Sequence, residues 1–321
     1  MSFIRHPKNP ILTPEPSHDW EDGAVFNPGA TLYKGKFYVL YRAIGEYEQY
    51  VSSVGLAESS DGVNFTRKAY PALVPEETYE KYGIEDLRIN SLEGSFYLTH
   101  TVLGCPATQG GEPHQIGLIK TYNFMEFKRL GVITPEVFCS RNGVLFPEKV
   151  GDNYVLLHRP LYLMQKGDFY PRKHGSLEGQ QIWICYSKNL LEWDWTTQSL
   201  LLEPAFWWEN YKVGAGPPPI KTQKGWLLIY HGVQETRQKS HIYRAGLALL
   251  DLNDPKKVLF RSKEPILQPE KKYELVGDTP NVVFPTGLVE KEGVLYLYYG
   301  AADKTVCLAT ASLQETLSSL C

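Results

Sequence analysis

Apolar and polar residues alternate with a period of two in short runs along most of the chain, which is the pattern of half-buried β-strands. Such runs include "KFYVLY" from Lys36, "SFYLTH" from Ser95 and "VLYLYY" from Val294. Each run follows a turn in which glycine stands beside lysine or glutamate, and these residues supply the positive φ and the polarity of a tight hairpin. The pattern therefore predicts an all-β protein built from hairpins.

Five segments follow one plan, in which a strand, a glycine-containing turn and an aromatic-rich strand succeed one another. They begin at Asn27, Glu85, Asn142, Gly214 and Asn281. Between them, a short apolar run followed by proline recurs at Pro14, Pro75, Pro135, Pro204 and Pro269. Third strands such as "VGLAESSDGVNF" and "IWICYSKNLLEW" recur as well. Each unit thus holds about four strands, the content of a propeller blade.

These repeats predict a five-bladed β-propeller. The last unit stops after "VCLATAS", whereas "NPILTPE" precedes the first hairpin. We therefore expect the N-terminal strand to complete the fifth blade and close the ring. A β-sandwich with chance similarities is the alternative, and two independent signatures in one register favour the propeller. No linker or shift of composition divides residues 1–321, which we interpret as a single domain.

Polar residues gather at one edge of the predicted hairpins. The start of the first strand and the end of the second lie at the same edge of a sheet, and in a propeller these edges meet around the central channel. The residues at these positions include Asn27, Arg42, Glu85, Asp86, Arg88, His100, Arg141, Asn142, His158, Arg159, Lys212, His231, Asp278, Asn281 and Asp303. Such groups are costly to bury without a partner or a ligand.

The predicted rim separates by charge. Arg141, Arg159, Lys212 and His231 come from the third and fourth blades, while the acids come from the second and fifth. The polar groups could satisfy one another and plug the channel. Because the cations outnumber the acids beside them, we favour a pocket for a small anion next to a neutral polyol.

Composition and charge narrow the classes of function. The 33 basic and 36 acidic residues nearly balance, which disfavours nucleic acid or a membrane as partner. The start "MSFIRHPKNPIL" lacks the apolar run of a signal peptide, so we expect a cytoplasmic protein. Five scattered cysteines without CxxC spacing favour reduced thiols. The eight histidines lack HxH or HxxxH spacing, so we expect no metal site.

Several motifs occur in order and together resemble one family. They are "NPGA", "GIEDLR", "RNGVLFPEKV…YVLLHRP", "GAGPPPI…GWLLIYHG" and "PNVVFPTG…YYGAAD", between about residue 6 and residue 312. This combination resembles the β-mannoside phosphorylases of glycoside hydrolase family 130. The resemblance implies a five-bladed propeller enzyme of the glycosyltransferase type. It would cleave β-mannosides reversibly with inorganic phosphate as co-substrate, without a cofactor, and release α-mannose 1-phosphate with inversion.

The resemblance also implies roles for individual residues. Asp86 corresponds to the general acid, which in the family is thought to pass its proton through the mannose 3-hydroxyl. The phosphate ligands fall on Arg141, Arg159, Lys212 and His231. The sequence departs from the family at Leu87, where proline is frequent; the backbone beside the acid should change in rigidity, but no chemistry is lost.

Sugar binding requires partners for hydroxyl groups. Our candidates are Asn27, Arg42, Arg88, Asp278, Asp303 and Tyr243. Strand alternation places Asp86 and Arg88 on one side and Glu85 on the other, so we interpret Glu85 as a structural residue. The loop 162–179, with His174, and the run "FWWENY" before Lys212 could form the acceptor subsite. For Trp207 and Trp208 packing between blades is the favoured interpretation.

Phosphate is already an anionic nucleophile, so a phosphorylase can dispense with the general base of an inverting hydrolase. An inverting β-mannosidase of the same fold is the first alternative, and the cationic cluster argues against it. A glycosidase with three rim carboxylates is the second, but Asn27 and Arg141 stand where two of them would be expected. A non-catalytic carbohydrate-binding propeller would leave Asp86 without a role. Exposed blade edges would also permit a homo-oligomer.

Overall fold

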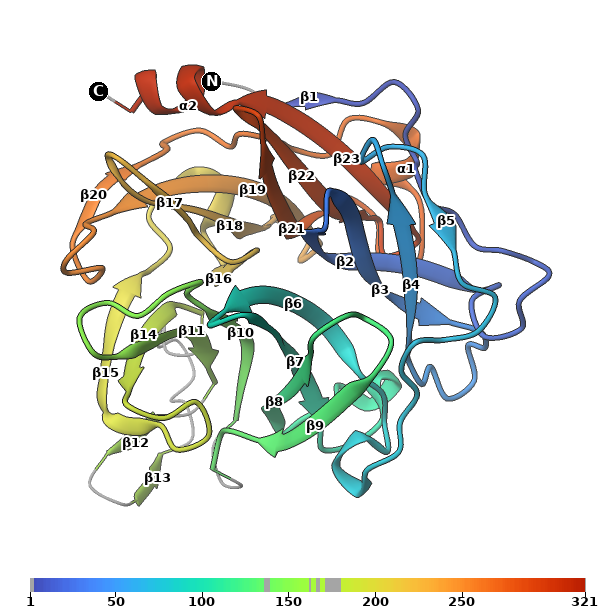
Figure 1. Ribbon diagram of the computed structural model, residues 1–321, viewed down its shortest axis with the longest axis horizontal. Helices are drawn as coiled ribbons and strands as arrows, with labels where there is room; N and C mark the ends of the chain where they lie inside the picture. The colour runs from blue at the N-terminus through green and yellow to red at the C-terminus, as the bar shows by residue number, and fades with distance from the viewer. Residues whose placement is uncertain (1–2, 136–138, 162, 166–167, 171–179, 321) are drawn as a thin grey trace.

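A computed structural model describes residues 3–135, 139–161, 163–165, 168–170 and 180–320. The strands form sheets arranged around a common centre as a five-bladed β-propeller, which confirms the predicted fold class (Figure 1). The first strands of neighbouring blades approach one another near the centre, as β2 does with β6 and β21. The loop 162–179, which we expected over the acceptor subsite, contains His174, and this residue lies outside the described residues.

The four blades built from consecutive segments each run antiparallel from the innermost strand outward. The first consists of β2 (Ala24–Tyr33), β3 (Lys36–Ile44), β4 (Ser53–Ser59) and β5 (Thr66–Arg67). The second consists of β6 (Glu85–Leu92), β7 (Ser95–Leu103), β8 (His114–Thr121) and β9 (Phe127–Val132). The third consists of β10 (Ser140–Leu145), β11 (Tyr154–Pro160), β14 (Ile182–Ser187) and β15 (Asp194–Leu202). The fourth consists of β16 (Lys212–Ala215), β17 (Ile220–Thr222), β18 (Gly225–Glu235), β19 (His241–Leu250) and β20 (Val258–Arg261).

The fourth blade has a divided inner strand, because β16 and β17 both pair with β18. The run Pro217–Pro219 lies between them, and proline has no N–H to give to a sheet. A separate hairpin is formed by β12 (Leu163–Gln165) and β13 (Asp168–Tyr170). The short helical segments are η1 (Thr78–Glu80), η2 (Ala107–Gln109), η3 (Trp207–Glu209), α1 (Lys272–Leu275) and α2 (Leu313–Ser318).

The fifth blade combines both ends of the described chain. It contains β21 (Val283–Lys291), β22 (Val294–Ala301), β23 (Thr305–Ser312) and β1 (Ile4–Arg5). In its outer pair, Ile4 lies opposite Thr310 and Arg5 opposite Ala309, in antiparallel register. The N-terminal strand is therefore the outermost strand of the last blade.

The hydrophobic core lies between the blades. Each of the five largest clusters of buried apolar side chains draws its members from two adjacent blades. Between the third and fourth blades, for example, Phe146 meets Trp226 edge to face, with 5.0 Å between the ring centroids. Burial of each large apolar side chain contributes roughly 1.5–3 kcal/mol. Packing of blade against blade therefore fixes where the inner strands end.

A β-bulge interrupts the innermost strand of each of the first three blades. The register shifts between Phe26 and Gly29, between Glu85 and Arg88, and between Arg141 and Val144. Each of the three bulges contains one non-glycine residue with left-handed backbone, namely Asn27 (φ 48°), Asp86 (φ 53°) and Asn142 (φ 56°). Asparagine and aspartate tolerate this conformation better than other non-glycine residues. A bulge places two residues of one strand opposite a single residue of its partner. The side chains at the bulge therefore depart from the alternation of the rest of the strand and point in a different direction.

In the part of the chain that the structure describes, no helix has the length and apolarity needed to cross a membrane.

Candidate active site

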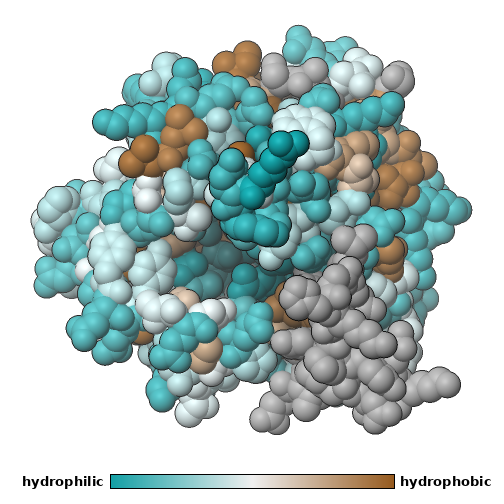
Figure 2. All heavy atoms as spheres, turned by 180° about the vertical axis from the view of Figure 1, so that it is seen from behind, coloured by the Kyte–Doolittle hydropathy of each residue, from teal (hydrophilic) through white to brown (hydrophobic). Residues whose placement is uncertain are grey.

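A small polar pocket opens where the inner strands of all five blades meet. Its volume is about 140 Å³. It is lined by Asn27, Arg42, Glu85, Asp86, Arg141, Asn142, Arg159, Lys212, His231, Tyr243, Val282, Phe284 and Asp303. Figure 2 shows a hydrophilic hollow near the middle of one face of the molecule. The hairpin edge that the sequence marked as polar is therefore the edge that lines a cavity.

Asp86 lies at the bulge of β6 and faces its counterpart in the first blade. Nδ2 of Asn27 donates a hydrogen bond to Oδ1 of Asp86 across 2.7 Å. Nη1 of Arg42 lies 3.8 Å from the same oxygen. The side chain of Asp86 keeps 15% of its surface exposed. The carboxyl group is thus oriented by two neighbours and is still open to a ligand.

Glu85 also lines this pocket, so the prediction that it lies apart from Asp86 is wrong. Its carboxylate forms a short ion pair with Nη2 of Arg42, whose Nε donates to Oγ of Ser52 at 3.0 Å. Burial raises the pKa of Glu85, and the charge of Arg42 opposes that effect. The prediction failed because it assumed strict alternation, and the bulge at Asp86 breaks that alternation.

Arg88 lies behind the pocket and is not among its lining residues. It is 1% exposed, and it donates hydrogen bonds to the backbone oxygens of Asp86 and Gly216, the latter at 3.3 Å. Burial lowers the pKa of Arg88 to about 10. In the structure Arg88 therefore holds the backbone that carries Asp86, whereas we expected it to contact sugar.

The cationic cluster assembles as expected on the third and fourth blades. Arg141 and Arg159 are direct neighbours across β10 and β11. Nε of Arg159 donates to Oδ1 of Asn142 at 3.0 Å. Nζ of Lys212 lies 5.3 Å from the ring centroid of Tyr243. Three permanent positive charges therefore border one small cavity.

His231 differs from the expectation in its charge. Its pKa is held well below the ordinary value by burial and by the positive charges of Arg159, Arg88, Lys212 and Arg141. The ring is therefore a neutral imidazole at neutral pH and can offer an N–H without adding a charge. It packs on Phe284 with 4.6 Å between ring centroids. A Cβ at position 214 would approach this ring within 2.4 Å, so Gly214 is needed there.

Two of the predicted sugar-binding acids occupy different places. Asp303 lines the pocket, and burial, together with the charges of Asp86 and Asp278, raises its pKa to about 6. Asp278 lies in an adjoining cavity of about 470 Å³ that shares Arg42 and Asp303 with the pocket. There it accepts hydrogen bonds from Tyr47 at 3.2 Å and Tyr50 at 3.3 Å. Asp278 therefore belongs to an outer compartment.

His114 is a site neighbour that the sequence reasoning did not find. Its Nε2 accepts a hydrogen bond from Nη2 of Arg141, and its backbone N–H lies 3.1 Å from Sγ of Cys139. Burial and nearby cations, first of all Arg141, lower the pKa of His114. The sequence reasoning considered only the first two strands of each blade. His114 begins the third strand, which starts at the same edge of the blade where the second strand ends.

The tryptophans of "FWWENY" do not line the pocket. Trp208 is fully buried and packs against Tyr230, with 5.8 Å between ring centroids, which agrees with the packing interpretation. Trp207 is 51% exposed and lines a different cavity beside Glu264 and Phe3. Tyr243 is the aromatic residue of our candidate set that reaches the pocket.

Among the described residues, no cluster of histidine, cysteine, aspartate and glutamate has the geometry of a metal site. The pocket instead combines three carboxyl groups, among them the oriented Asp86, with four fixed cations and several hydrogen-bonding groups. Such a set can hold an anion close to a polyhydroxylated ring and deliver a proton beside it.

Comparison with known proteins gives consistent matches over the full length. Residues 4–320 match the family model Glyco_hydro_130, described as beta-1,4-mannooligosaccharide phosphorylase. The chain is 38% identical over 311 residues to the 1,2-beta-oligomannan phosphorylase of Thermoanaerobacter sp. (strain X514), covering 95% of this chain and 96% of that protein. It is 37% identical over 325 residues to the beta-1,2-mannobiose phosphorylase of the same strain, covering 98% of each.

A solved structure shows the same architecture. The beta-1,2-mannobiose phosphorylase from Listeria innocua, in complex with beta-1,2-mannobiose, superposes with a TM-score of 0.82 at 28% identity. The superposition covers 100% of this chain and 99% of that chain.

Proposed function

The chain belongs to glycoside hydrolase family 130 and is a glycoside phosphorylase of the glycosyltransferase type. From this premise we propose that it cleaves β-1,2-linked mannooligosaccharides with inorganic phosphate, releasing α-mannose 1-phosphate and the shortened acceptor. The observation that carries the proposal is that Asp86 shares one pocket with Arg141, Arg159 and Lys212. An acid thus stands beside an anion site, as attack by phosphate on a glycoside requires.

The choice of the β-1,2 linkage is supported by the activities after which two relatives and the superposed protein are named. The description of the family model names the β-1,4 linkage instead. The β-1,2 linkage is therefore a separate part of the proposal, and comparison of β-1,2- and β-1,4-linked substrates tests it.

In the proposed reaction, HPO₄²⁻ bound by the cationic cluster attacks the anomeric carbon from the face opposite the leaving oxygen. The bond between that carbon and the bridging oxygen breaks, and the proton of Asp86 is transferred to this oxygen. As the family resemblance implies, the proton passes through the mannose 3-hydroxyl. The proton of the phosphate group then restores Asp86. One C–O bond forms, one breaks, and the configuration inverts.

The cations of the pocket replace the general base of a hydrolase. Arginine can hold two phosphate oxygens with its planar fork, and Lys212 adds a compact charge. Holding the nucleophile in line contributes up to about 7–11 kcal/mol in well-oriented systems. The neutral ring of His231 can donate one hydrogen bond to a phosphate oxygen. The carboxylate of Glu85 is engaged by Arg42, which leaves it poorly disposed to activate water.

The proposal is tested by incubating the protein with β-1,2-mannobiose, β-1,2-mannotriose and β-1,4-mannobiose, each with and without phosphate. ³¹P and ¹H NMR of the products identify mannose 1-phosphate and its anomer. We expect the α anomer from the β-1,2 substrates only when phosphate is present. Free mannose without phosphate would indicate a hydrolase. Preferential turnover of β-1,4-mannobiose would overturn the linkage, and the β anomer would overturn inversion.

A further inference from the structure

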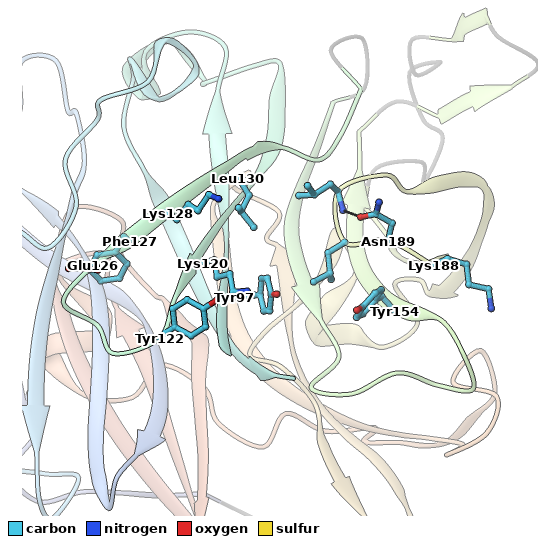
Figure 3. Close-up of a pocket in the computed structure, with 12 residues that line it drawn as sticks. Tyr97, Lys120, Tyr122, Glu126, Phe127, Lys128, Leu130, Tyr154, Lys188 and Asn189 are labelled. Atoms are coloured by element: carbon cyan, nitrogen blue, oxygen red, sulfur yellow. Dashed lines mark hydrogen bonds between the residues drawn. The ribbon is translucent and has the colours of Figure 1, made fainter. Parts of the chain in front are cut away.

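A second and larger cavity lies between the second and third blades. Its volume is about 710 Å³, and it shares no lining residue with the candidate active site. It is lined by Tyr97, Lys120, Tyr122, Glu126, Phe127, Lys128, Leu130, Tyr154, Lys188, Asn189, Leu190 and Leu191 (Figure 3). Tyr97 lies near the start of β7 and Lys120 near the end of β8. The active-site edge holds the opposite ends of these strands, so the cavity belongs to the hairpin-turn edge of the propeller.

One wall of this cavity is a row of three side chains across the second blade. Tyr97 lies directly opposite Lys120 on β7 and β8, and Lys120 lies directly opposite Lys128 on β8 and β9. Like charges directly opposite one another in an antiparallel pair are destabilising. Hydrogen bonds with Tyr122 and Tyr97 nevertheless raise the pKa of Lys120, so the charged form of this lysine is favoured at the cavity wall.

Two acids near the cavity are paired with other lysines, whereas a third, Glu126, lines the cavity without an ion pair among the described residues. Glu93 pairs with Lys149 at 3.1 Å and accepts a hydrogen bond from Tyr154 at 2.9 Å. Asp152 pairs with Lys188 at 3.5 Å. Within the described parts of the chain, no carboxylate lies within 4.0 Å of the ammonium group of Lys120 or Lys128. An anion entering the cavity would meet three lysines, Lys120, Lys128 and Lys188, against the single carboxylate of Glu126.

Aromatic surface adjoins the lysine pair. Nζ of Lys120 lies 5.2 Å from the ring centroid of Tyr97 and 4.8 Å from that of Tyr122. Tyr122 is 61% exposed, so its ring offers a free face, and Figure 3 shows it near Lys120 and Tyr97. From the third blade, Asn189 contributes an amide whose Oδ1 accepts from the backbone N–H of Leu191 at 2.9 Å. The N–H groups of that amide remain available as donors.

We propose that this cavity is a binding site for a phosphorylated sugar. Lys120 and Lys128 hold the phosphate group, and lysine is an established phosphate ligand. The pyranose ring lies against the face of Tyr122, with Asn189 donating to a hydroxyl group. The choice of mannose 1-phosphate as the specific ligand rests on the proposed function, because it is the product of that reaction. The cavity would then bind the reaction product at a site separate from the proposed active site.

The test is isothermal titration of the full-length protein with α-mannose 1-phosphate. We expect two sites in the wild type. The variant K120Q/K128Q should weaken one of them at least about tenfold and leave the other unchanged. Arg159→Ala should weaken the other site and spare the first. The matched control K256Q/K257Q removes two exposed lysines from the loop of the fourth blade and should retain both sites.

Further titrations identify the ligand class. Inorganic phosphate should compete at the Lys120 site with lower affinity, and mannose alone should not bind there detectably. Tyr122→Ala should weaken the sugar phosphate more than phosphate, whereas Tyr70→Ala, which removes another exposed tyrosine, should change neither. Tighter binding of adenosine monophosphate than of mannose 1-phosphate would overturn the sugar assignment. A single site in the wild type, unchanged in K120Q/K128Q, would overturn the whole inference.

These outcomes separate the two proposals. If the proposed function fails, the site that depends on Arg159 is missing or binds no sugar phosphate, yet the site that depends on Lys120 remains measurable.

Discussion

Asn27 and Asp86 occupy corresponding bulges in neighbouring blades and meet through a hydrogen bond of 2.7 Å from Nδ2 of Asn27 to Oδ1 of Asp86. Both residues have left-handed backbone, with φ of 48° and 53°. The local strain of two strands thus brings the proposed acid and its partner together at the centre of the ring. A strained conformation at a pocket is typical of functional sites.

Replacement of Asp86 by asparagine should lower kcat for phosphorolysis of β-1,2-mannobiose by about 10²–10⁴, the usual range for a general acid. The affinity for phosphate should stay within about twofold of the wild type, because the cations remain. A 2,4-dinitrophenyl β-mannoside, whose leaving group needs no proton, should restore much of the rate. Equal loss on both substrates would remove Asp86 from the role of acid. Asp254→Asn, between β19 and β20 and with 42% of its side-chain surface exposed, serves as the control.

Asn27 allows backbone and side-chain effects to be separated. Asn27→Gly removes the hydrogen bond to Asp86 and keeps the positive φ available, whereas Asn27→Ala removes the bond and also opposes that φ. We expect both variants to lower kcat by about tenfold. The alanine variant should also unfold more easily than the glycine variant, by about 1–2 kcal/mol in urea titrations. Wild-type kcat in the glycine variant would show that the hydrogen bond does not position the acid.

His114 should act as a positioning residue for Arg141. His114→Leu removes the acceptor of the arginine hydrogen bond, and bonds to charged groups contribute about 1.5–3 kcal/mol. We expect the KM for phosphate to rise by about tenfold or more while the KM for mannobiose changes little. His114→Gln, whose carbonyl oxygen can take the place of Nε2, should recover most of the loss. A uniform fall in kcat with an unchanged phosphate KM in the leucine variant would indicate a structural role alone.

The carboxyl group of Asp303 predicts a pH dependence of stability. Its pKa is raised to about 6 in the fold from an ordinary value of 3.8, so between about pH 4 and 6 the folded state binds more protons than the unfolded state. Stability from this group is therefore fully present below about pH 4 and is lost as pH rises through 6. Relative to the wild type, Asp303→Asn should gain about 1–3 kcal/mol between pH 4 and pH 7. Urea titrations at both pH values measure this difference, and a difference that is constant with pH would contradict the raised pKa.

The architecture could be predicted from the sequence because period-two alternation and the repeated turns are local signals. The hairpin-edge argument also found Asn27, Asp86 and Lys212, since a residue at the start of an inner strand must reach the channel. The same argument placed Glu85 at the rim, but strict strand alternation wrongly separated it from Asp86, because a bulge shifts the side-chain direction without leaving a mark in the hydrophobic pattern. The neutral state of His231 was equally beyond the sequence, because it depends on burial and on cations from other blades.

The hydrophobic clusters shared between adjacent blades have a consequence for folding. Among the residues that the structure describes, no single blade has a large apolar cluster of its own, so removal of one blade would expose the faces of two neighbours. The proposed catalytic pocket draws residues from every blade, and Lys212 and Asp86 come together only when the ring is complete. Loss of one blade should therefore abolish turnover instead of reducing it in proportion. Enzymatic activity would then report the fraction of molecules whose ring is fully assembled.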